Sequence, residues 1–205
     1  MQPGAFFREP YHFEVLARTV LPELARAGGR RIRLWSAGCS SGEEAWSLAM
    51  IVEEARLPPD LGAGIVASDS DPHALARASD AVYTDLRMAR VTAERRQRHF
   101  VRGVGPRQGL WRVTAPLRDR VEFCALDLMG PWPARDPFDV VVCHDPIAAL
   151  DPPGAARLVR RFAEILAPGG VMFLGANEAV PDGIAGLEVH GRAIYRKLAA
   201  VARTG

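Results

Sequence analysis

The chain has 205 residues, 48% of them hydrophobic and 24% charged, a balance typical of a soluble domain long enough to bury one core. Its formal net charge is +2 and its arginines are spread over both halves, so we expect no nucleic-acid partner. The cysteines Cys39, Cys124 and Cys143 lie far apart and outside any metal-binding or disulfide pattern, which predicts a cytoplasmic location and no metal site.

The first half of the chain predicts a βαβ unit behind an N-terminal helix. Apolar spacing indicates the helices, and Gly28-Gly29 and Pro58-Pro59 mark two of the breaks between elements. The predicted elements are a helix at 12–27, a strand at 32–36, a helix at 43–56, a strand at 63–68 and a helix at 72–78.

The second half resumes the strand and helix alternation after a small insert. A basic helical stretch at 92–100 leads into residues 100–121, whose Gly and Pro punctuation predicts a small antiparallel β-subdomain. The later elements are strands at 121–125 and 138–143, a helix at 152–166, and strands at 171–175 and 193–197. None has the ~20 apolar residues of a membrane span and the N-terminus lacks the apolar core of a signal peptide, so no membrane insertion is expected.

This alternation predicts an α/β fold in which residues 1–205 form one domain, a three-layer sandwich around a doubly wound sheet, with 100–121 inserted in it. Ligands of such sheets bind at the carboxyl ends of the strands. We therefore expect the residues that follow the strands at 32–36, 63–68, 121–125 and 138–143 to rim one cleft.

The loop after the first strand argues against a phosphate ligand. Residues 37–42 read AGCSSG, which matches neither G-x-G-x-x-G nor a P-loop. Glu43 and Glu44 follow at the start of a helix, where carboxylates compete with anions for the free N–H groups. With Asp69 placed for a ribose diol and Asp127 for an adenine edge, S-adenosylmethionine (SAM) fits, because it carries a sulfonium, an amino group and no phosphate.

Structural roles are open alternatives for the same residues. The two glutamates are also ordinary first-turn acids after Ser40 and Ser41 as caps, and Asp69 and Asp71 can cap the helix entered at Pro72. Asp145-Pro146 predicts a helix N-cap followed by a proline at the first helical position.

Two further groups of side chains also have structural interpretations. Cys39 and Cys143 are expected to be buried apolar groups. The arginines between residues 87 and 98 predict a solvated helical face, with an acidic protein partner as the alternative. They are Arg87, Arg90, Arg95, Arg96 and Arg98.

Five segments resemble, in order and spacing, the C-terminal catalytic domain of CheR-type chemotaxis receptor methyltransferases. They are FFREPYHFEVL, WSAGCSSGEEAWSLAM, ASDSDPHALARASDAVYT, FVRGVGPRQGL and RRFAEILAPGGVMFLGANEAV, and together they cover nearly the whole chain. The resemblance implies a class I SAM-dependent methyltransferase fold, Rossmann-like, that esterifies glutamate side chains of bacterial chemoreceptors. The insert resembles the family's β-subdomain, which in some members docks a receptor's C-terminal pentapeptide.

The resemblance also implies the site residues. Arg8 and His144 are the implied catalytic residues, and the implied cofactor contacts are Arg8, Ala37, Gly38, Glu44, Asp69, Asp127, Leu128, Cys143 and His144. Methyl transfer to an ionised carboxylate needs orientation more than a base. We therefore expect Arg8 to position the incoming glutamate.

The chain departs from the family pattern near the methyl acceptor. Family sequences read close to CRNVxIYF where this chain has CHDPIAAL at 143–150, Asn where Asp127 stands, and NxTxFFR where this chain has Gln2 and Gly4. The family's helical N-terminal domain is missing, so the chain is either truncated or recognises its partner differently.

The main functional prediction is methyl transfer to glutamates of a chemoreceptor's cytoplasmic helices or of a similar acidic segment. One alternative is a cofactor-binding regulatory or degenerate module with weak or no catalysis. The other is a methyltransferase in which His144 and Asp145 serve a different acceptor.

Overall fold

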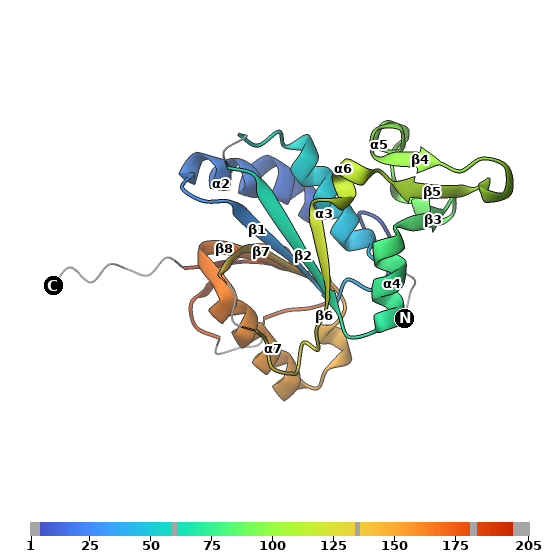
Figure 1. Cartoon of the computed structure of the whole chain (residues 1–205). Coiled ribbons are helices and arrows are strands. Elements are labelled where there is room, and N and C mark those ends of the chain that lie inside the picture. Colours follow the sequence, from blue (N-terminus) through green and yellow to red (C-terminus); the bar gives the residue numbers. More distant parts are fainter. Residues whose placement is uncertain (1–4, 59–60, 134–135, 181–183, 199–205) are drawn as a thin grey trace.

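A seven-stranded sheet separates two helical layers in the computed structural model, with a second, three-stranded sheet at one end (Figure 1). The structure describes residues 5–58, 61–133, 136–180 and 184–198. The predicted α/β sandwich with a small antiparallel sheet is confirmed. Within the described ranges, no helix has both the length and the apolar character needed to cross a bilayer.

The large sheet is parallel except at one edge. Its strands, in spatial order, are β6 (Val121–Ala125), β2 (Ala63–Asp69), β1 (Ile32–Ala37), β7 (Phe138–Cys143), β8 (Leu166–Leu174), β10 (Ile194–Lys197) and β9 (Leu187–Gly191). β10 pairs antiparallel with β8 and β9, and the remaining pairs are parallel. The carboxyl ends of β6, β2, β1 and β7 therefore meet at one edge, as predicted.

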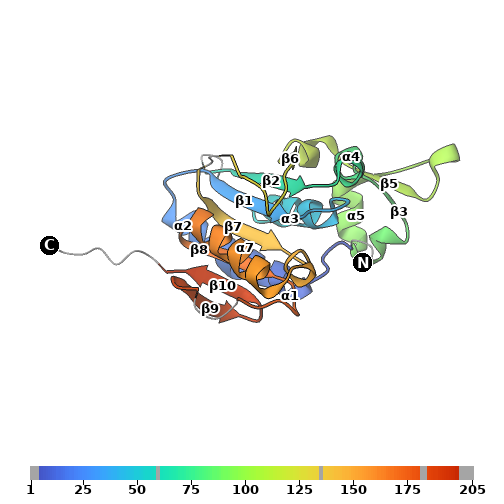
Figure 2. The same ribbon diagram turned by 90° about the horizontal axis from the view of Figure 1, so that it is seen from below.

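Helices cover both faces of this sheet. The α-helices are α1 (Pro10–Val15), α2 (Leu21–Ala27), α3 (Glu43–Glu54), α4 (Pro72–Asp80), α5 (Ala93–His99), α6 (Ala115–Arg118) and α7 (Pro152–Ile165). The single-turn elements are a π-helix η1 (Leu16–Val20) and the 3₁₀ turns η2 (Arg87–Arg90), η3 (Gly105–Arg107) and η4 (Ile147–Ala149). Helices α1 to α3 lie on one face and α7 on the other (Figures 1 and 2).

Alternation along β1 explains the two cores. Ile32 and Leu34 pack with α1 to α3, whereas Trp35 and Ala37 face α7. The residues predicted for the core are all buried; they are Trp35, Val140, Val141, Val142, Phe162, Leu166 and Phe173. The strand β7 is buried along its whole length, as expected of a central parallel strand.

The structure differs from the predicted elements in three places. The helix expected over 12–27 starts at Pro10 and is interrupted by η1, which precedes Pro22, a residue without an N–H to donate. The strand expected at 171–175 begins earlier, at Leu166, so that Gly169 and Gly170 lie inside β8, next to a register irregularity with β7. The edge strand β9 has an exposed, weakly apolar pattern and was not predicted.

The small sheet extends beyond the predicted insert. Its order is β3 (Val82–Thr84), β5 (Leu110–Val113) and β4 (Phe100–Arg102), with antiparallel pairing throughout. The central and one edge strand lie within 100–121, but β3 comes from before that range. A strand of three residues is too short to produce a recognisable alternation, which is why sequence patterning does not detect it.

Candidate functional site

A cavity of about 550 Å³ opens at the carboxyl ends of β1, β2 and β7, and we name it the carboxyl-edge cavity. Its walls come from the loop after β1, the end of β2, the start of α4, the loop after β7 and the N-terminal segment. This volume lies within the roughly 300–1,000 Å³ of small-molecule sites. The cavity therefore forms where the strand order predicted a ligand cleft.

The loop after β1 is fixed by the end of β2. The amides of Gly38 and Cys39 both donate to the Ser68 carbonyl at 2.8 Å. Gly38 has a φ of +79°, and a Cβ atom there would lie 2.6 Å from the side chain of Pro146. Only glycine therefore lets the loops after β1 and β7 approach each other on the cavity wall.

The first glutamate of α3 makes a structural ion pair. Neither Ser40 nor Ser41 caps the helix; the N-cap is Gly42, without a side-chain cap bond, so the predicted serine caps are wrong. Instead Ser41 Oγ donates to Glu43 at 2.7 Å, and Glu43 pairs with Arg87. The Glu43 side chain is 2% exposed, so its carboxylate is neutralised inside the protein.

The second glutamate faces the cavity. One Glu44 carboxylate oxygen accepts from Ser36 Oγ at 2.6 Å, and the other lies 2.8 Å from Nδ1 of His144. The side chain is 15% exposed and borders the cavity. Both glutamates border the cavity, but they have separate partners: Glu43 is bound to Arg87, whereas Glu44 is held by Ser36 and His144.

The two aspartates at the end of β2 have different roles. Asp69 holds the loop after β1, and Asp71 caps α4. Asp69 accepts from the Ser40 amide at 2.7 Å and from the Asp71 amide at 2.9 Å, and it borders the cavity. Asp71 is the N-cap of α4 and accepts from the His73 amide at 2.8 Å. The capping alternative therefore holds for Asp71 but is wrong for Asp69.

The other predicted contact residues lie at different depths. Leu128 borders the cavity, whereas Ala37 and Cys143 are fully buried strand ends and Asp127 is exposed and accepts from the Met129 amide. Cofactor contact by the latter three stays a prediction. Gln2 and Gly4 lie outside the described residues. Burial raises the pKa of both Cys39 and Cys143, in accord with apolar roles for these thiols.

A buried pair of histidines connects the cavity to the far edge of the sheet. His144 Nε2 lies 3.0 Å from His12 Nδ1, and His12 Nε2 lies 2.9 Å from the Arg192 carbonyl oxygen. Burial lowers the pKa of His144, but pairing with Glu44 outweighs it and raises the pKa overall. Burial, assisted by the nearby His144, lowers the pKa of His12.

His12 was not among the predicted site residues. It lies on the face of α1 that packs against the sheet, where a histidine among apolar residues carries no motif. Its partner is 132 residues away in the chain. Only the packing of α1 against the end of β7 makes the pair visible.

The loop after β7 is held by an ion pair and a buried carboxylate. Asp145 has a φ of +79° and pairs with Arg8 across the cavity, so the predicted N-cap role of Asp145 is wrong. Glu178, which is 7% exposed, accepts from the amides of Asp145, Ala148 and Gly175 at 3.3, 2.8 and 2.7 Å. Glu178 therefore fixes the segment CHDPIAAL, a role that the sequence analysis did not predict.

Most arginines of η2 and α5 are engaged, so the predicted solvated face is wrong for them. Arg95 donates to Glu54 at 2.9 and 2.7 Å, and Arg96 donates to two backbone carbonyls. Arg87 pairs with buried Glu43. These contacts join the small sheet's flanking elements to α3.

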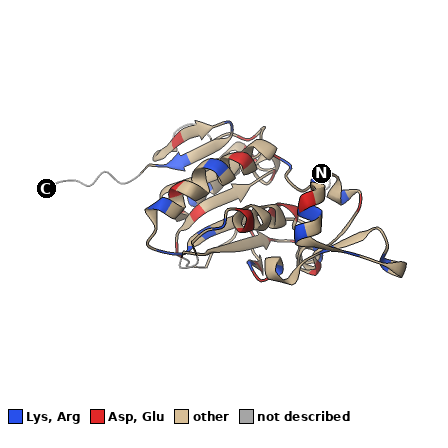
Figure 3. Ribbon diagram, turned by 90° about the horizontal axis from the view of Figure 1, so that it is seen from above, with Lys and Arg blue, Asp and Glu red and all other residues tan. Residues whose placement is uncertain are grey.

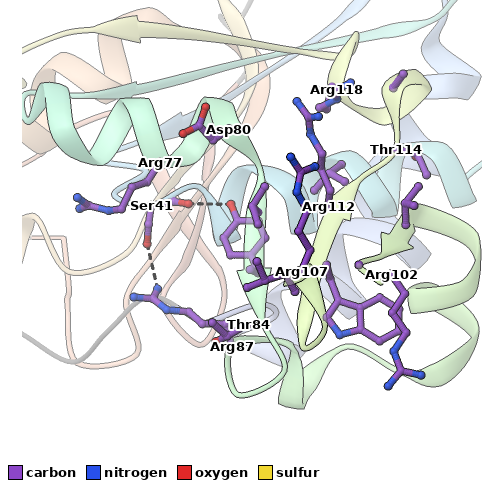
Figure 4. Close-up of a pocket in the computed structure, with 18 of the residues that line it drawn as sticks. Ser41, Arg77, Asp80, Thr84, Arg87, Arg102, Arg107, Arg112, Thr114 and Arg118 are labelled. Carbon is purple, nitrogen blue, oxygen red and sulfur yellow. Dashed lines mark hydrogen bonds between the residues drawn. The ribbon is translucent and has the colours of Figure 1, made fainter. Parts of the chain in front are cut away.

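A second concavity, the arginine hollow, lies on the small sheet beside α4 and α6 and has a volume of about 880 Å³ (Figure 4). Its lining contains one carboxylate, Asp80, and six arginines, which are Arg77, Arg87, Arg102, Arg107, Arg112 and Arg118. In the parts of the chain that the structure describes, Arg87 is the one among these six with an ion pair to a carboxylate. Basic positions also occur elsewhere on the molecule (Figure 3), so the hollow is distinguished by its shortage of acids.

No group of three or more His, Cys, Asp or Glu side chains within the described ranges is arranged to hold a metal ion. The chemistry of the carboxyl-edge cavity therefore comes from carboxylates, two arginines, one histidine and apolar walls.

Comparison with known proteins shows similarity to members of one family. Residues 2–191 match the family model described as "CheR methyltransferase, SAM binding domain". Chemotaxis protein methyltransferase 1 of Pseudomonas aeruginosa is 39% identical over 200 residues, covering 93% of this chain and 72% of that protein. The chemotaxis protein methyltransferase of Escherichia coli strain K12 is 34% identical over 175 residues, covering 85% of this chain and 59% of that protein.

A solved structure supports the fold alone. That of PKMT2 from Rickettsia typhi is 14% identical, with a TM-score of 0.51, and the match covers 84% of this chain and 26% of that one. The family match over residues 2–191, together with 39% identity to a relative covered over 72% of its length, shows that the chain belongs to the CheR methyltransferase family and contains its SAM-binding domain.

Proposed function

We propose that the protein transfers the methyl group of SAM to glutamate side-chain carboxylates of a chemoreceptor-like protein. The observation that carries this proposal is the carboxyl-edge cavity, in which Glu44 and Asp69 lie beside the apolar side chains of Leu126 and Leu128. Its position at the strand ends is the usual ligand position of this fold. The relatives named as chemotaxis protein methyltransferases supply the acceptor class.

The residues of the cavity fit SAM, which when bound supplies an electrophilic methyl group on a sulfonium. Glu44 and Asp69 retain acceptor lone pairs for an ammonium and a ribose diol, and the leucines offer an apolar surface for a purine. Arg8 is neutralised by Asp145, so it does not oppose a cationic ligand.

The protein's own part in the reaction is orientation. A glutamate acceptor is ionised at neutral pH and needs no general base. Arg8 donates from one Nη atom to Asp145 and keeps further N–H donors with which it can hold the incoming carboxylate. Both ring nitrogens of His144 are occupied by Glu44 and His12, so we assign His144 to shaping the cavity rather than to proton abstraction.

We further propose that an acidic segment of the acceptor protein docks in the arginine hollow. Five of its arginines have no ion pair with a carboxylate in the described part of the chain, so their charge is available to a partner. The hollow shares Arg77 with the carboxyl-edge cavity, which puts a docked segment next to the reaction site. Peptide docking on the β-subdomain and a cytoplasmic location both stay predictions.

The test is transfer of tritiated methyl groups from SAM to purified chemoreceptor cytoplasmic fragments, with release of the label by mild base. Base-labile incorporation that disappears when the acceptor glutamates are replaced by alanine supports the proposal. Base-stable label indicates another acceptor. No label, in a chain that binds S-adenosylhomocysteine (SAH) by calorimetry, favours a cofactor-binding regulatory module.

A further inference from the structure

Four groups form one buried chain of hydrogen bonds that ends at the cavity. Glu44 lies 2.8 Å from His144 Nδ1, His144 Nε2 lies 3.0 Å from His12 Nδ1, and His12 Nε2 lies 2.9 Å from the Arg192 carbonyl oxygen. His144 is 8% and His12 is 4% exposed, so bulk water does not compete for these positions.

The two ends of this chain restrict where its protons lie. The Arg192 carbonyl can only accept, so His12 carries a proton on Nε2, and a neutral His12 offers its Nδ1 lone pair to His144. His144 must then donate from Nε2. At Nδ1 it faces Glu44, and a carboxylate can only accept, so His144 must donate there as well.

A histidine ring that donates from both nitrogens is an imidazolium. The competing arrangement, a neutral His144 with a protonated Glu44, needs a proton on the carboxyl instead, although Ser36 Oγ donates to Glu44 at 2.6 Å and favours the carboxylate. A doubly protonated His12 beside a neutral His144 would also satisfy these hydrogen bonds, but it would move the positive charge one ring away from the Glu44 carboxylate, which lies 2.8 Å from His144 Nδ1. Protonating both rings would set two N–H groups against each other. The pair therefore holds one positive charge, and that charge lies on His144.

The surrounding charges act in the same direction. Glu9, Glu44 and Glu178 all face His144 from different elements and favour its charged form, and Glu9 and Glu44 also face His12. The nearby pair of Arg8 and Asp145 is neutral as a unit. Net negative surroundings therefore stabilise one buried cation at this place.

We propose that His12 is a positioning residue, which holds His144 as an imidazolium and thereby fixes the Glu44 carboxylate at the cavity wall. The consequence for SAM binding rests on the proposed function, whereas the protonation pattern does not. His12 is not itself part of the cavity lining and acts through His144, which is.

Two substitutions separate this role from mere packing. His12→Phe keeps a ring in the contact with Phe173 but removes the acceptor for His144. His12→Asn loses the ring, yet its side-chain oxygen occupies the place of Nδ1 and can still accept. Exposed His73 gives a matched control, His73→Gln.

The decisive measurement is the ¹⁵N NMR titration of the imidazoles in the unliganded chain, whose five histidines can be assigned by single variants. We expect His144 doubly protonated and His12 neutral with its proton on Nε2 at pH 7. Loss of one hydrogen bond to the cation should lower the His144 pKa by about one unit in His12→Phe, and not in His12→Asn or His73→Gln. A neutral His144 at pH 7, or an identical titration in His12→Phe, would overturn the proposal.

Calorimetry with SAH tests the consequence. Affinity should fall about fivefold in His12→Phe and recover in His12→Asn, because only the former weakens the charge-assisted hydrogen bond between His144 and Glu44. Equal affinities in wild type and His12→Phe would overturn the role in the cavity. Absence of SAH binding by the wild type would count against the proposed function alone, since the NMR result stands without a ligand.

Discussion

The carboxyl-edge cavity and the arginine hollow share Arg77, but they treat charge in opposite ways. In the cavity, Arg8 pairs with Asp145 and His144 with Glu44, and Asp69 accepts from two backbone amides, so these groups are held by partners from the same chain. The hollow holds six arginines and a single aspartate.

Paired and unpaired charges have different consequences for ligand binding. Paired charges hold side chains in place before a ligand arrives, which lowers the cost of ordering them on binding. Unbalanced charges attract a partner of the opposite sign and make the association depend on salt. The cavity therefore suits a small cationic cofactor and the hollow suits an acidic protein segment.

The largest effect should come from removing the cavity's acidic charge. Glu44→Gln keeps the shape of the side chain but leaves the cation of His144 without its counterion, so we expect SAH affinity to fall about a hundredfold. Calorimetry measures this affinity. The matched control is Glu43→Gln, which removes the neighbouring charge and should lower thermal stability while changing SAH affinity less than about threefold. Equal losses in the two variants would contradict the division of roles.

Removing the cation of the cavity should affect the acceptor rather than the cofactor. In Arg8→Ala, kcat/KM for the protein acceptor should fall about thirtyfold, because a charged hydrogen-bond donor to the reacting carboxylate is lost. SAH affinity should stay within about threefold. Turnover equal to that of the wild type, with normal cofactor binding, would remove Arg8 from the mechanism.

The contact between α3 and α5 should be sensitive to acid. Burial raises the pKa of Glu54, but hydrogen bonds from His99 and Arg95 outweigh it and lower the pKa to about 2. A lowered carboxyl pKa stabilises the fold above the unfolded value of about 4.5, and this contribution is lost as the pH falls from there towards 2.

Urea unfolding at pH 6 and pH 3 measures this contribution. Because the Glu54 side chain is 26% exposed, we expect the wild type to lose about 1–2 kcal/mol more than Glu54→Gln over this interval. Exposed Glu94 on α5 supplies the control, Glu94→Gln, which should follow the wild type. If Glu54→Gln loses as much stability as the wild type, the network does not have this role.

The smallest effect should be on docking. Arg112→Glu should raise the acceptor KM about fivefold at low salt, less at high salt, and leave SAH affinity unchanged, because one of several screened charges is reversed. The same reversal at exposed Arg160 on α7 is the control. A KM unaffected by Arg112→Glu, or affected equally by Arg160→Glu, would place the acceptor elsewhere.

Much of the fold could be predicted from local patterns. The apolar run at 138–143 identified a central strand, and the AGCSSG loop between a strand and a helix identified one wall of the cavity. Position after a strand also placed Asp69 on the cavity. Asp127, which follows β6, is exposed and outside the cavity lining, because a loop residue's direction depends on its own turn, and its contact with a cofactor stays a prediction.

The order of strands and helices and the buried positions were determined by the sequence itself, because apolar periodicity and glycine or proline breaks act within a few residues. The charge pairs were decided only by the tertiary structure. Arg8 and Asp145 are 137 residues apart and His12 and His144 are 132 apart, so no local pattern couples them. Their roles follow from burial: a charge removed from water must find its partner among whatever side chains the packed fold brings near.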